Sequence, residues 1–146
     1  MRSHQPTPQD VSKRMAKTHG RDNAREIAIR SGLHKQGLRF RIHYTIDAIS
    51  RRTIDIAFPR LRLAVFCDGC FWHGCPKHRT FPRTNASWWL RKIDTNIARD
   101  QDTSRRLRAN GWKVVRIWGH VDTADAVRTI AHAIEEEKRR RTVAVR

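Results

Sequence analysis

The feature that most limits the possible folds of this chain is the run LRLAVF at residues 61–66. A run of this length that is apolar at all but one position is typical of a strand in the centre of a sheet. Other segments rich in apolar residues predict further strands at residues 38–42, 53–58 and 112–118. The sequence therefore predicts a sheet in which residues 61–66 form a central strand.

Helical patterns lie before and after these strands. Residues 22–37 predict a first helix, with Ile27, Ala28 and Leu33 at apolar positions. Residues 125–141 predict a terminal helix whose acidic and basic residues can pair along one face. The chain therefore supplies helices on both sides of its strand segments.

A long helix is predicted at residues 87–109, capped by Ser87 and closed by Asn110-Gly111. Its apolar stripe consists of Leu90, Ile93, Ile97 and Leu107. The expected order is thus helix, three strands, long helix, strand and helix. This order predicts an α/β (α+β) fold of one domain, with a mixed central sheet flanked by helices.

Length and charge indicate one domain with an anionic partner. With 146 residues, the chain is long enough for a single core. Residues 1–20 read as a basic, partly flexible arm, residues 21–141 as the folded domain and residues 142–146 as a basic tail. The 31 Lys and Arg against 14 Asp and Glu leave a net charge of +17, which favours a nucleic acid as partner. The alternative is a basic protein whose charge serves only solubility.

Cysteine usage indicates a reducing compartment. The three cysteines, Cys67, Cys70 and Cys75, lie within nine positions, whereas a secreted disulfide framework spreads its cysteines along the chain. The first ten residues, MRSHQPTPQD, lack the apolar run that a signal peptide would have, and no stretch is long and apolar enough to span a membrane. We therefore expect a cytoplasmic protein without a membrane partner.

The spacing Cys70-x4-Cys75-x2-His78 predicts a structural zinc site, because two thiolates and an imidazole lie close enough to share one tetrahedral ion. The fourth ligand would be His73, Cys67 or His120. We favour His120, since a ligand beyond the last strand cross-links two distant segments and leaves His73 available for catalysis. The competing interpretation is small buried thiols with surface histidines.

Three acidic residues stand out in this cationic chain: Asp55, Asp68 and Asp100. Asp55 is the informative one, because a carboxylate inside an apolar strand is costly unless it is paired or holds a cation such as Mg²⁺. A salt bridge to an arginine is the alternative. His73 lies in a polar loop and could act as a general base, since its pKa is ordinarily close to neutrality.

Aromatic residues beside basic ones can stack on nucleic-acid bases or wedge between them. Phe71, Trp72, Trp88 and Trp89 fit this description, with core packing as the alternative for each. Trp112 and Trp118, on the last predicted strand, are assigned to the core.

Three blocks, VFCDGCFWHGCPKH, WWLRKIDTNIARD and GWKVVRIWGH, occur in this order and together resemble the very short patch repair (Vsr) DNA mismatch endonucleases. The resemblance covers roughly residues 11–120. It implies a PD-(D/E)xK nuclease-like fold that nicks duplex DNA 5′ to the T of a T·G mismatch arising from deaminated 5-methylcytosine. The partner would be DNA containing that mismatch, and mismatch-repair proteins would be further partners of a monomer at the bacterial nucleoid.

The resemblance also implies roles for individual residues. Asp55 would be the main Mg²⁺ ligand, helped by the backbone carbonyl of Cys67, and Glu26 would complete the metal region. His73 would be the base, supported by Asp100. The structural zinc would be bound by Cys70, Cys75, His78 and His120. The wedge that enters the DNA stack would be formed by Phe71, Trp72 and Trp89.

Two departures from the family pattern leave questions open. Ile54 stands immediately before Asp55, where family members often have a proline, so the resemblance does not define the local geometry of this strand. Asp68 stands where some relatives carry histidine, and it is either an extra metal ligand or a loop residue. The rival to an enzyme is a non-catalytic, zinc-stabilised nucleic-acid-binding module in which Asp55 is only structural.

Overall fold

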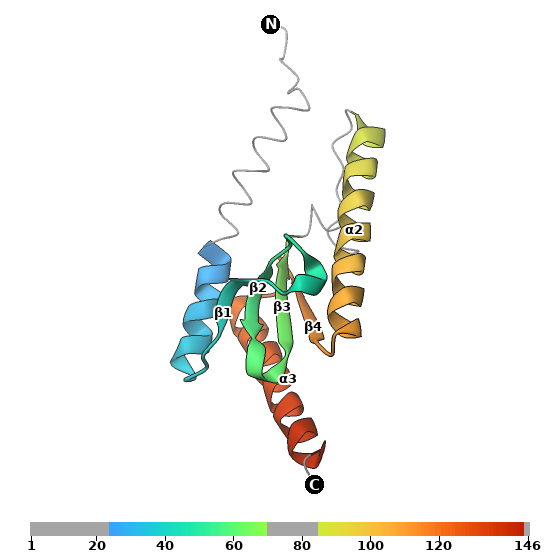
Figure 1. The fold of residues 1–146 in the computed structure, drawn as a ribbon. Coiled ribbons are helices and arrows are strands. Elements are labelled where there is room, and N and C mark those ends of the chain that lie inside the picture. Colours follow the sequence, from blue (N-terminus) through green and yellow to red (C-terminus); the bar gives the residue numbers. More distant parts are fainter. Residues whose placement is uncertain (1–23, 70–84, 145–146) are drawn as a thin grey trace, which may run out of the picture.

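A computed structural model describes residues 24–69 and 85–144 of the chain, and Figure 1 shows their arrangement. A helix occupies residues 24–35, and we call it the N-terminal helix. The later elements are β1 (Arg41–Tyr44), η1 (Asp47–Ile49), β2 (Ile54–Phe58), η2 (Pro59–Leu61), β3 (Leu63–Asp68), α2 (Ala86–Ala109), β4 (Lys113–Trp118) and α3 (Thr123–Ala144). The predicted order of helices and strands is confirmed. None of the described helices is both long and apolar enough to cross a membrane.

The strands form one mixed sheet in the order β1-β2-β3-β4. β1 pairs with β2 and β2 with β3 in antiparallel fashion, whereas β3 and β4 are parallel. The run at residues 61–66 contributes most of β3, which is an interior strand as predicted. Because β3 and β4 are parallel, their carboxyl ends meet at one edge of the sheet, where the Gly119 N–H donates to the Asp68 carbonyl (2.8 Å).

Apolar clusters cover both faces of the sheet, because side chains alternate along β3. Leu63 and Val65 pack on one face with residues of the N-terminal helix and α3. Ala64 and Phe66 pack on the other face, against α2 and η1. The domain therefore has three layers, with helices on both sides of the sheet (Figure 1).

The end of the N-terminal helix explains why the first strand begins later than predicted. Gly37, at a φ of 75°, donates to the His34 carbonyl, and the Leu38 N–H donates to the Leu33 carbonyl. This is the Schellman arrangement that ends a helix with glycine. It uses Leu38 as part of the helix cap, so the predicted strand at residues 38–42 is wrong at its start and β1 begins at Arg41.

The predicted buried positions of the first helix need correction. Ile27 is 54% exposed and Ala28 is exposed, whereas Ile29 and Leu33 are fully buried. The helix is thus rotated relative to the expected stripe. Gly32 sets how closely it packs on α3, because a Cβ at this position would lie 2.7 Å from Val127 Cγ2.

The helix α2 ends as predicted and begins differently. Its last turn is closed by Gly111, with a φ of 81°, and the Trp112 N–H donates to the Leu107 carbonyl. The N-cap is Asn85 in a left-handed conformation, and Ser87 lies inside the helix, so the prediction of Ser87 as cap is wrong. Within the predicted stripe, Leu90 is exposed.

Candidate carboxylate site

Asp55 lies where β2 separates from β3. The register between these strands ends at the pair Ile56 and Val65. Beyond this pair, the Cys67 backbone N–H donates to Asp55 Oδ2 (2.8 Å) instead of to a carbonyl of β2. The side chain of Asp55 therefore replaces a ladder hydrogen bond, which fixes its carboxylate at the end of β3 and reduces the cost of its position in an apolar strand.

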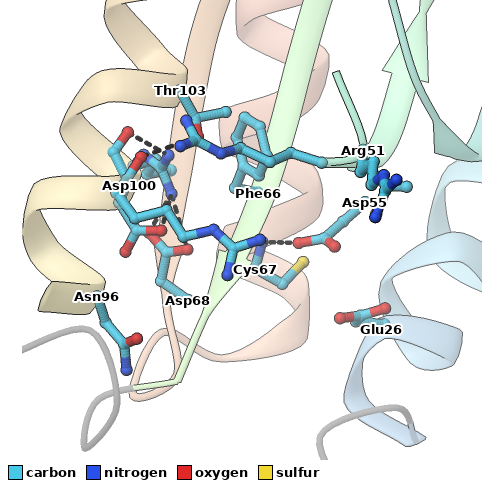
Figure 2. A pocket seen from close by; sticks show the side chains of 13 residues that line it. Glu26, Arg51, Asp55, Phe66, Cys67, Asp68, Asn96, Asp100 and Thr103 are labelled. Carbon is cyan, nitrogen blue, oxygen red and sulfur yellow. Dashed lines mark hydrogen bonds and ion pairs between the residues drawn. The ribbon is translucent and has the colours of Figure 1, made fainter. Parts of the chain in front are cut away.

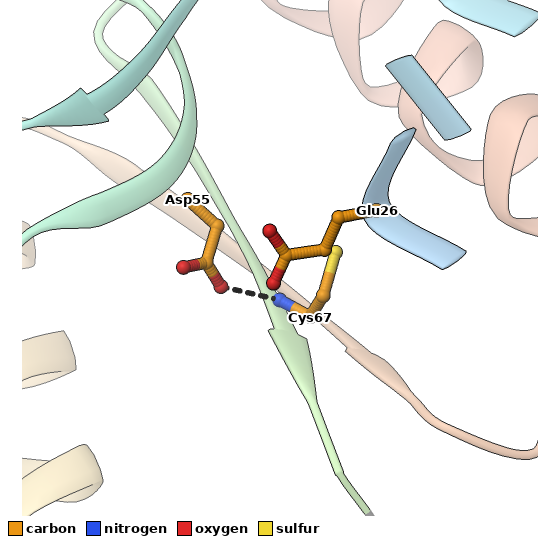
Figure 3. Close-up of side chains that lie close together, drawn as sticks. All are labelled: Glu26, Asp55 and Cys67. Carbon is orange, nitrogen blue, oxygen red and sulfur yellow. Dashed lines mark hydrogen bonds between the residues drawn. The ribbon is translucent and has the colours of Figure 1, made fainter. Parts of the chain in front are cut away.

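Glu26 reaches the same place from the N-terminal helix, as Figure 3 shows. One carboxylate oxygen each of Glu26 and Asp55 and the Cys67 sulfur all lie within 4.8 Å of one another. Arg30, one turn later, holds Glu26 through an ion pair of 2.9 Å. Arg25 donates to the Trp118 carbonyl (3.0 Å) and so ties this helix to the end of β4.

The charges at this cluster favour a hard cation bound by oxygen. Burial raises the pKa of the Cys67 thiol to about 12, and the nearby carboxylates of Asp55, Glu26 and Asp68 act in the same direction. A neutral thiol is a poor ligand for Mg²⁺, whereas one or two carboxylates with water and phosphate oxygens are its usual set. Glu26 and Asp55 therefore fit Mg²⁺. That the Cys67 backbone carbonyl is a further Mg²⁺ ligand stays a prediction.

The carboxylates open onto a pocket of about 560 Å³ (Figure 2). Its acidic lining residues are Glu26, Asp55, Asp68 and Asp100. Its basic lining residues are Arg51, Arg52, Arg99 and Arg116. Two of its walls are β3 and α2, so the pocket lies at the edge of the sheet where β2 and β3 separate.

Asp68 is the last residue of β3, and its carboxylate is buried against Arg116 of β4. Arg116 donates to both carboxylate oxygens, at 2.9 and 3.0 Å. The same guanidinium donates to Ser104 Oγ (3.0 Å) and to the Asp100 carbonyl (3.0 Å), and it lies over the Phe66 ring at 4.3 Å. Asp68 is therefore a strand residue paired with an arginine, so the alternative of a mere loop residue is wrong. Its role as an extra metal ligand stays a prediction.

Sequence reasoning missed this pair. Asp68 and Arg116 are 48 positions apart, and each looks like an isolated charge at the end of an apolar segment. A usable signal was present, because both strands were predicted and a charged residue lies within two positions of the predicted carboxyl end of each. Only the parallel pairing of β3 and β4 brings the two into contact.

The other predicted catalytic residues are described only in part. Asp100 lies on α2 and lines the pocket, with its side chain 4.0 Å from Arg116 Nη1. His73 lies outside the described residues, so its support by Asp100 stays a prediction.

The zinc prediction rests on a topology that the structure confirms. A fourth ligand at His120 requires the strands before the two ligand segments to be neighbours in the sheet, and β3 and β4 are neighbours. His120 therefore follows β4 at the edge of the sheet where Gly69 follows β3. Cys70, Cys75 and His78 lie outside the described residues, and the zinc site itself stays a prediction.

The two adjacent tryptophans of α2 differ in exposure. Trp89 is 1% exposed and packs edge-on against Trp88, which is 38% exposed. A wedge formed by Trp89 stays a prediction that requires this ring to leave its buried position. Phe71 and Trp72 lie outside the described residues. Trp112 is buried as predicted, and Trp118 is half-buried.

Similar proteins place this chain in a family. Residues 4–79 match the family model described as DNA mismatch endonuclease Vsr. Type II nicking enzyme V.NaeI of Lentzea aerocolonigenes is 38% identical over 112 residues, which cover 75% of this chain and 67% of that protein. Type II nicking enzyme V.XorIIP of Xanthomonas oryzae pv. oryzae is 41% identical over 106 residues, which cover 71% of this chain and 75% of that protein.

DNA mismatch endonuclease Vsr of Escherichia coli (strain K12) is 36% identical over 111 residues, which cover 73% of this chain and 67% of that protein. The family match spans more than half of the chain, and each of these relatives matches more than two thirds of it. The chain therefore belongs to the Vsr family of DNA mismatch endonucleases.

Proposed function

We propose that this protein nicks duplex DNA 5′ to the T of a T·G mismatch by Mg²⁺-dependent hydrolysis of a phosphodiester bond. The observation that carries the proposal is the meeting of Glu26 and Asp55 at the end of β3, in a pocket that also presents arginines. The printed names of its relatives, a mismatch endonuclease and nicking enzymes, agree with such a reaction. We further propose that it acts as a monomer on DNA of the bacterial nucleoid.

The carboxylates would bind the metal, and the other residues of the pocket would position the DNA. The chemistry that Mg²⁺ supplies when bound is stabilisation of negative charge on the phosphate oxygens. Asp55 is preoriented by the Cys67 N–H, and Glu26 is held by Arg30, so neither carboxylate must reorganise on metal binding. This preorganisation supports a metal site over a merely structural pair.

The roles that we assign outside the described residues rest on the sequence. His73 would accept a proton from the attacking water, and Asp100 would orient its imidazole. Zinc bound by Cys70, Cys75, His78 and His120 would brace the loop that carries His73. Phe71 and Trp72, within that braced loop, would enter the stack beside the mismatch, where a wobble pair costs less to unstack than a matched pair.

The decisive experiment compares end-labelled duplexes that differ only in T·G or T·A at one position. We expect a single nick in the T·G duplex, only when Mg²⁺ is added. Asp55→Asn should abolish the nick while preserving the circular dichroism spectrum. Asp47→Asn is the matched control, because Asp47 is exposed on η1 and lines neither of the pockets described for this part of the chain.

The outcomes separate the competing functions. Tight binding of DNA without a nick under any divalent metal would support the non-catalytic binding module. Equal nicking of both duplexes would retain the nuclease and refute the mismatch specificity. For the loop, we expect about one equivalent of zinc in the purified protein, lost in Cys75→Ser. His73→Ala should keep the zinc and slow nicking by ~10²–10⁴.

A further inference from the structure

The four arginines of the pocket divide into two kinds. Arg116 is neutralised by Asp68. Arg52 is neutralised in the same way, because its Nη1 lies 2.7 Å from Asp102 Oδ2 and donates to Thr103 Oγ1 (2.9 Å). Both guanidiniums are therefore bound to a carboxylate of α2 or β3, and their main effect is to hold the walls of the pocket together.

Arg51 and Arg99 have no such partner. Both side chains are exposed, and neither makes a hydrogen bond or ion pair with the part of the chain that the structure describes. Arg51 precedes β2, and Arg99 lies on α2. Both nevertheless line the carboxylate pocket, so they present to it, from two different elements, guanidinium groups that no ion pair with the described residues occupies.

A second hollow extends this arrangement away from the carboxylates. It has a volume of about 270 Å³ and is lined by Ile49, Ser50, Arg51, Arg52, Arg99 and Arg106. Three of these residues, Arg51, Arg52 and Arg99, also line the carboxylate pocket. The two hollows therefore adjoin, and their shared wall carries the two unpaired guanidiniums.

Among the residues that the structure describes, no carboxylate lines the second hollow. Asp102 forms ion pairs with two arginines that line this hollow, Arg52 and Arg106, and also with Arg105. One carboxylate cannot neutralise three arginines, so the hollow keeps a net positive charge. Such a hollow suits an oxyanion, and guanidinium groups bind phosphate through two parallel hydrogen bonds.

We propose that Arg51 and Arg99 form a subsite for a DNA backbone phosphate next to the one that is cleaved. The proposal rests on the proposed nuclease function, because that function places the scissile phosphate at Glu26 and Asp55. The strand would then continue from the carboxylate pocket into the arginine-lined hollow. Contacts of this kind fix the register of the duplex without reading its sequence.

The first test measures the salt dependence of DNA binding. The affinity for a fluorescent T·G duplex is determined by anisotropy over a range of KCl concentrations, without added Mg²⁺ so that the duplex stays intact. Arg51→Gln and Arg99→Gln should each make the slope of log K against log [KCl] shallower by about 0.9. The change should be the same for a T·A duplex, because phosphates are alike in both.

Arg108→Gln is the matched control. Arg108 is exposed on α2, lines neither hollow, and lies nine residues from Arg99, which places it on the opposite side of the helix. Its removal changes the net charge by the same amount and should leave the slope within error of the wild type. Slopes of Arg51→Gln and Arg99→Gln equal to that of the control would overturn the proposal.

The second test locates the phosphate. A neutral methylphosphonate replaces one backbone phosphate at a time on the nicked strand. Wild-type binding should weaken most at a position adjacent to the nick, and Arg51→Gln should lose this sensitivity. A pattern unchanged by the substitution overturns the subsite. The result is independent of catalysis, because a wild type that never nicks refutes the proposed function while these binding differences still support the subsite.

Discussion

The buried pair of Asp68 and Arg116 permits a quantitative prediction about stability. Replacing Arg116 with methionine keeps much of the side-chain length but removes all four hydrogen bonds of the guanidinium. The Asp68 side chain is only 5% exposed, so its buried charge would lose both hydrogen bonds from its arginine partner. Breaking a buried pair in this way costs about 3–5 kcal/mol.

The lower end of this range applies here, because the Arg116 side chain is 23% exposed and water can reach part of the site. A loss of about 3 kcal/mol corresponds to a melting temperature lower by roughly 6–12 °C for a chain of this size. Asp68→Asn should cost less, about 1–2 kcal/mol, because the amide oxygen still accepts one hydrogen bond and the guanidinium can turn toward solvent.

The assay is equilibrium unfolding in urea, followed by tryptophan fluorescence at a fixed zinc concentration. The double variant Asp68→Leu with Arg116→Met removes both charges together and should be more stable than Arg116→Met alone. Arg41→Met, at an exposed position of β1, is the control and should change stability by no more than about 0.5 kcal/mol. If the losses of stability in Asp68→Leu and Arg116→Met, each made singly, add up to the loss in the double variant within about 0.5 kcal/mol, the pair has no coupling energy and the reasoning is refuted.

Three further predictions concern packing and charge. Gly32→Ala should destabilise the protein by roughly 1–3 kcal/mol despite the better helix propensity of alanine, because the new methyl group meets Val127, and Val127→Ala in the same chain should restore stability. Hydrogen bonds from three neighbouring arginines, Arg52 first, lower the pKa of Asp102 from 3.8 to about 2. Its stabilising effect should therefore be complete above pH 4 and be lost as the pH falls through 2, and acid unfolding of Asp102→Asn should lack this component. Trp89→Ala should cost about 3–5 kcal/mol in urea unfolding, whereas Trp88→Ala should cost much less, and equal losses would contradict the burial difference.

Local patterns in the sequence were sufficient for the elements of the fold. The apolar run at residues 61–66 identified an interior strand because hydrophobicity at consecutive positions reports burial directly. Gly37 and Gly111 marked helix ends because a left-handed backbone favours glycine. Asp55 stood out because a carboxylate between two isoleucines needs a partner or a cation. These signals are carried by neighbouring residues, so no tertiary information was required.

The choice between alternatives at the site depended on contacts between distant segments. Sequence left Asp68 as a ligand or a loop residue, and the parallel pairing of β3 and β4 made it the partner of Arg116. Glu26 was assigned only through the family resemblance, since nothing in its own helix indicates that it meets Asp55. The reason is geometric, because a periodic pattern gives the face of an element but not what packs against that face.

The same limit applies to the charges and aromatic rings of α2. Thirty-one basic residues predict an anionic partner, but their number does not say which guanidiniums are already paired. Only the packing of α2 against the rest of the domain neutralises Arg52 and leaves Arg99 exposed. Adjacent tryptophans are equivalent in sequence, yet Trp89 is buried and Trp88 is not. The sequence by itself determined the elements and the chemistry available, and the tertiary structure decided which groups meet, because pairing and burial arise from contacts between distant segments.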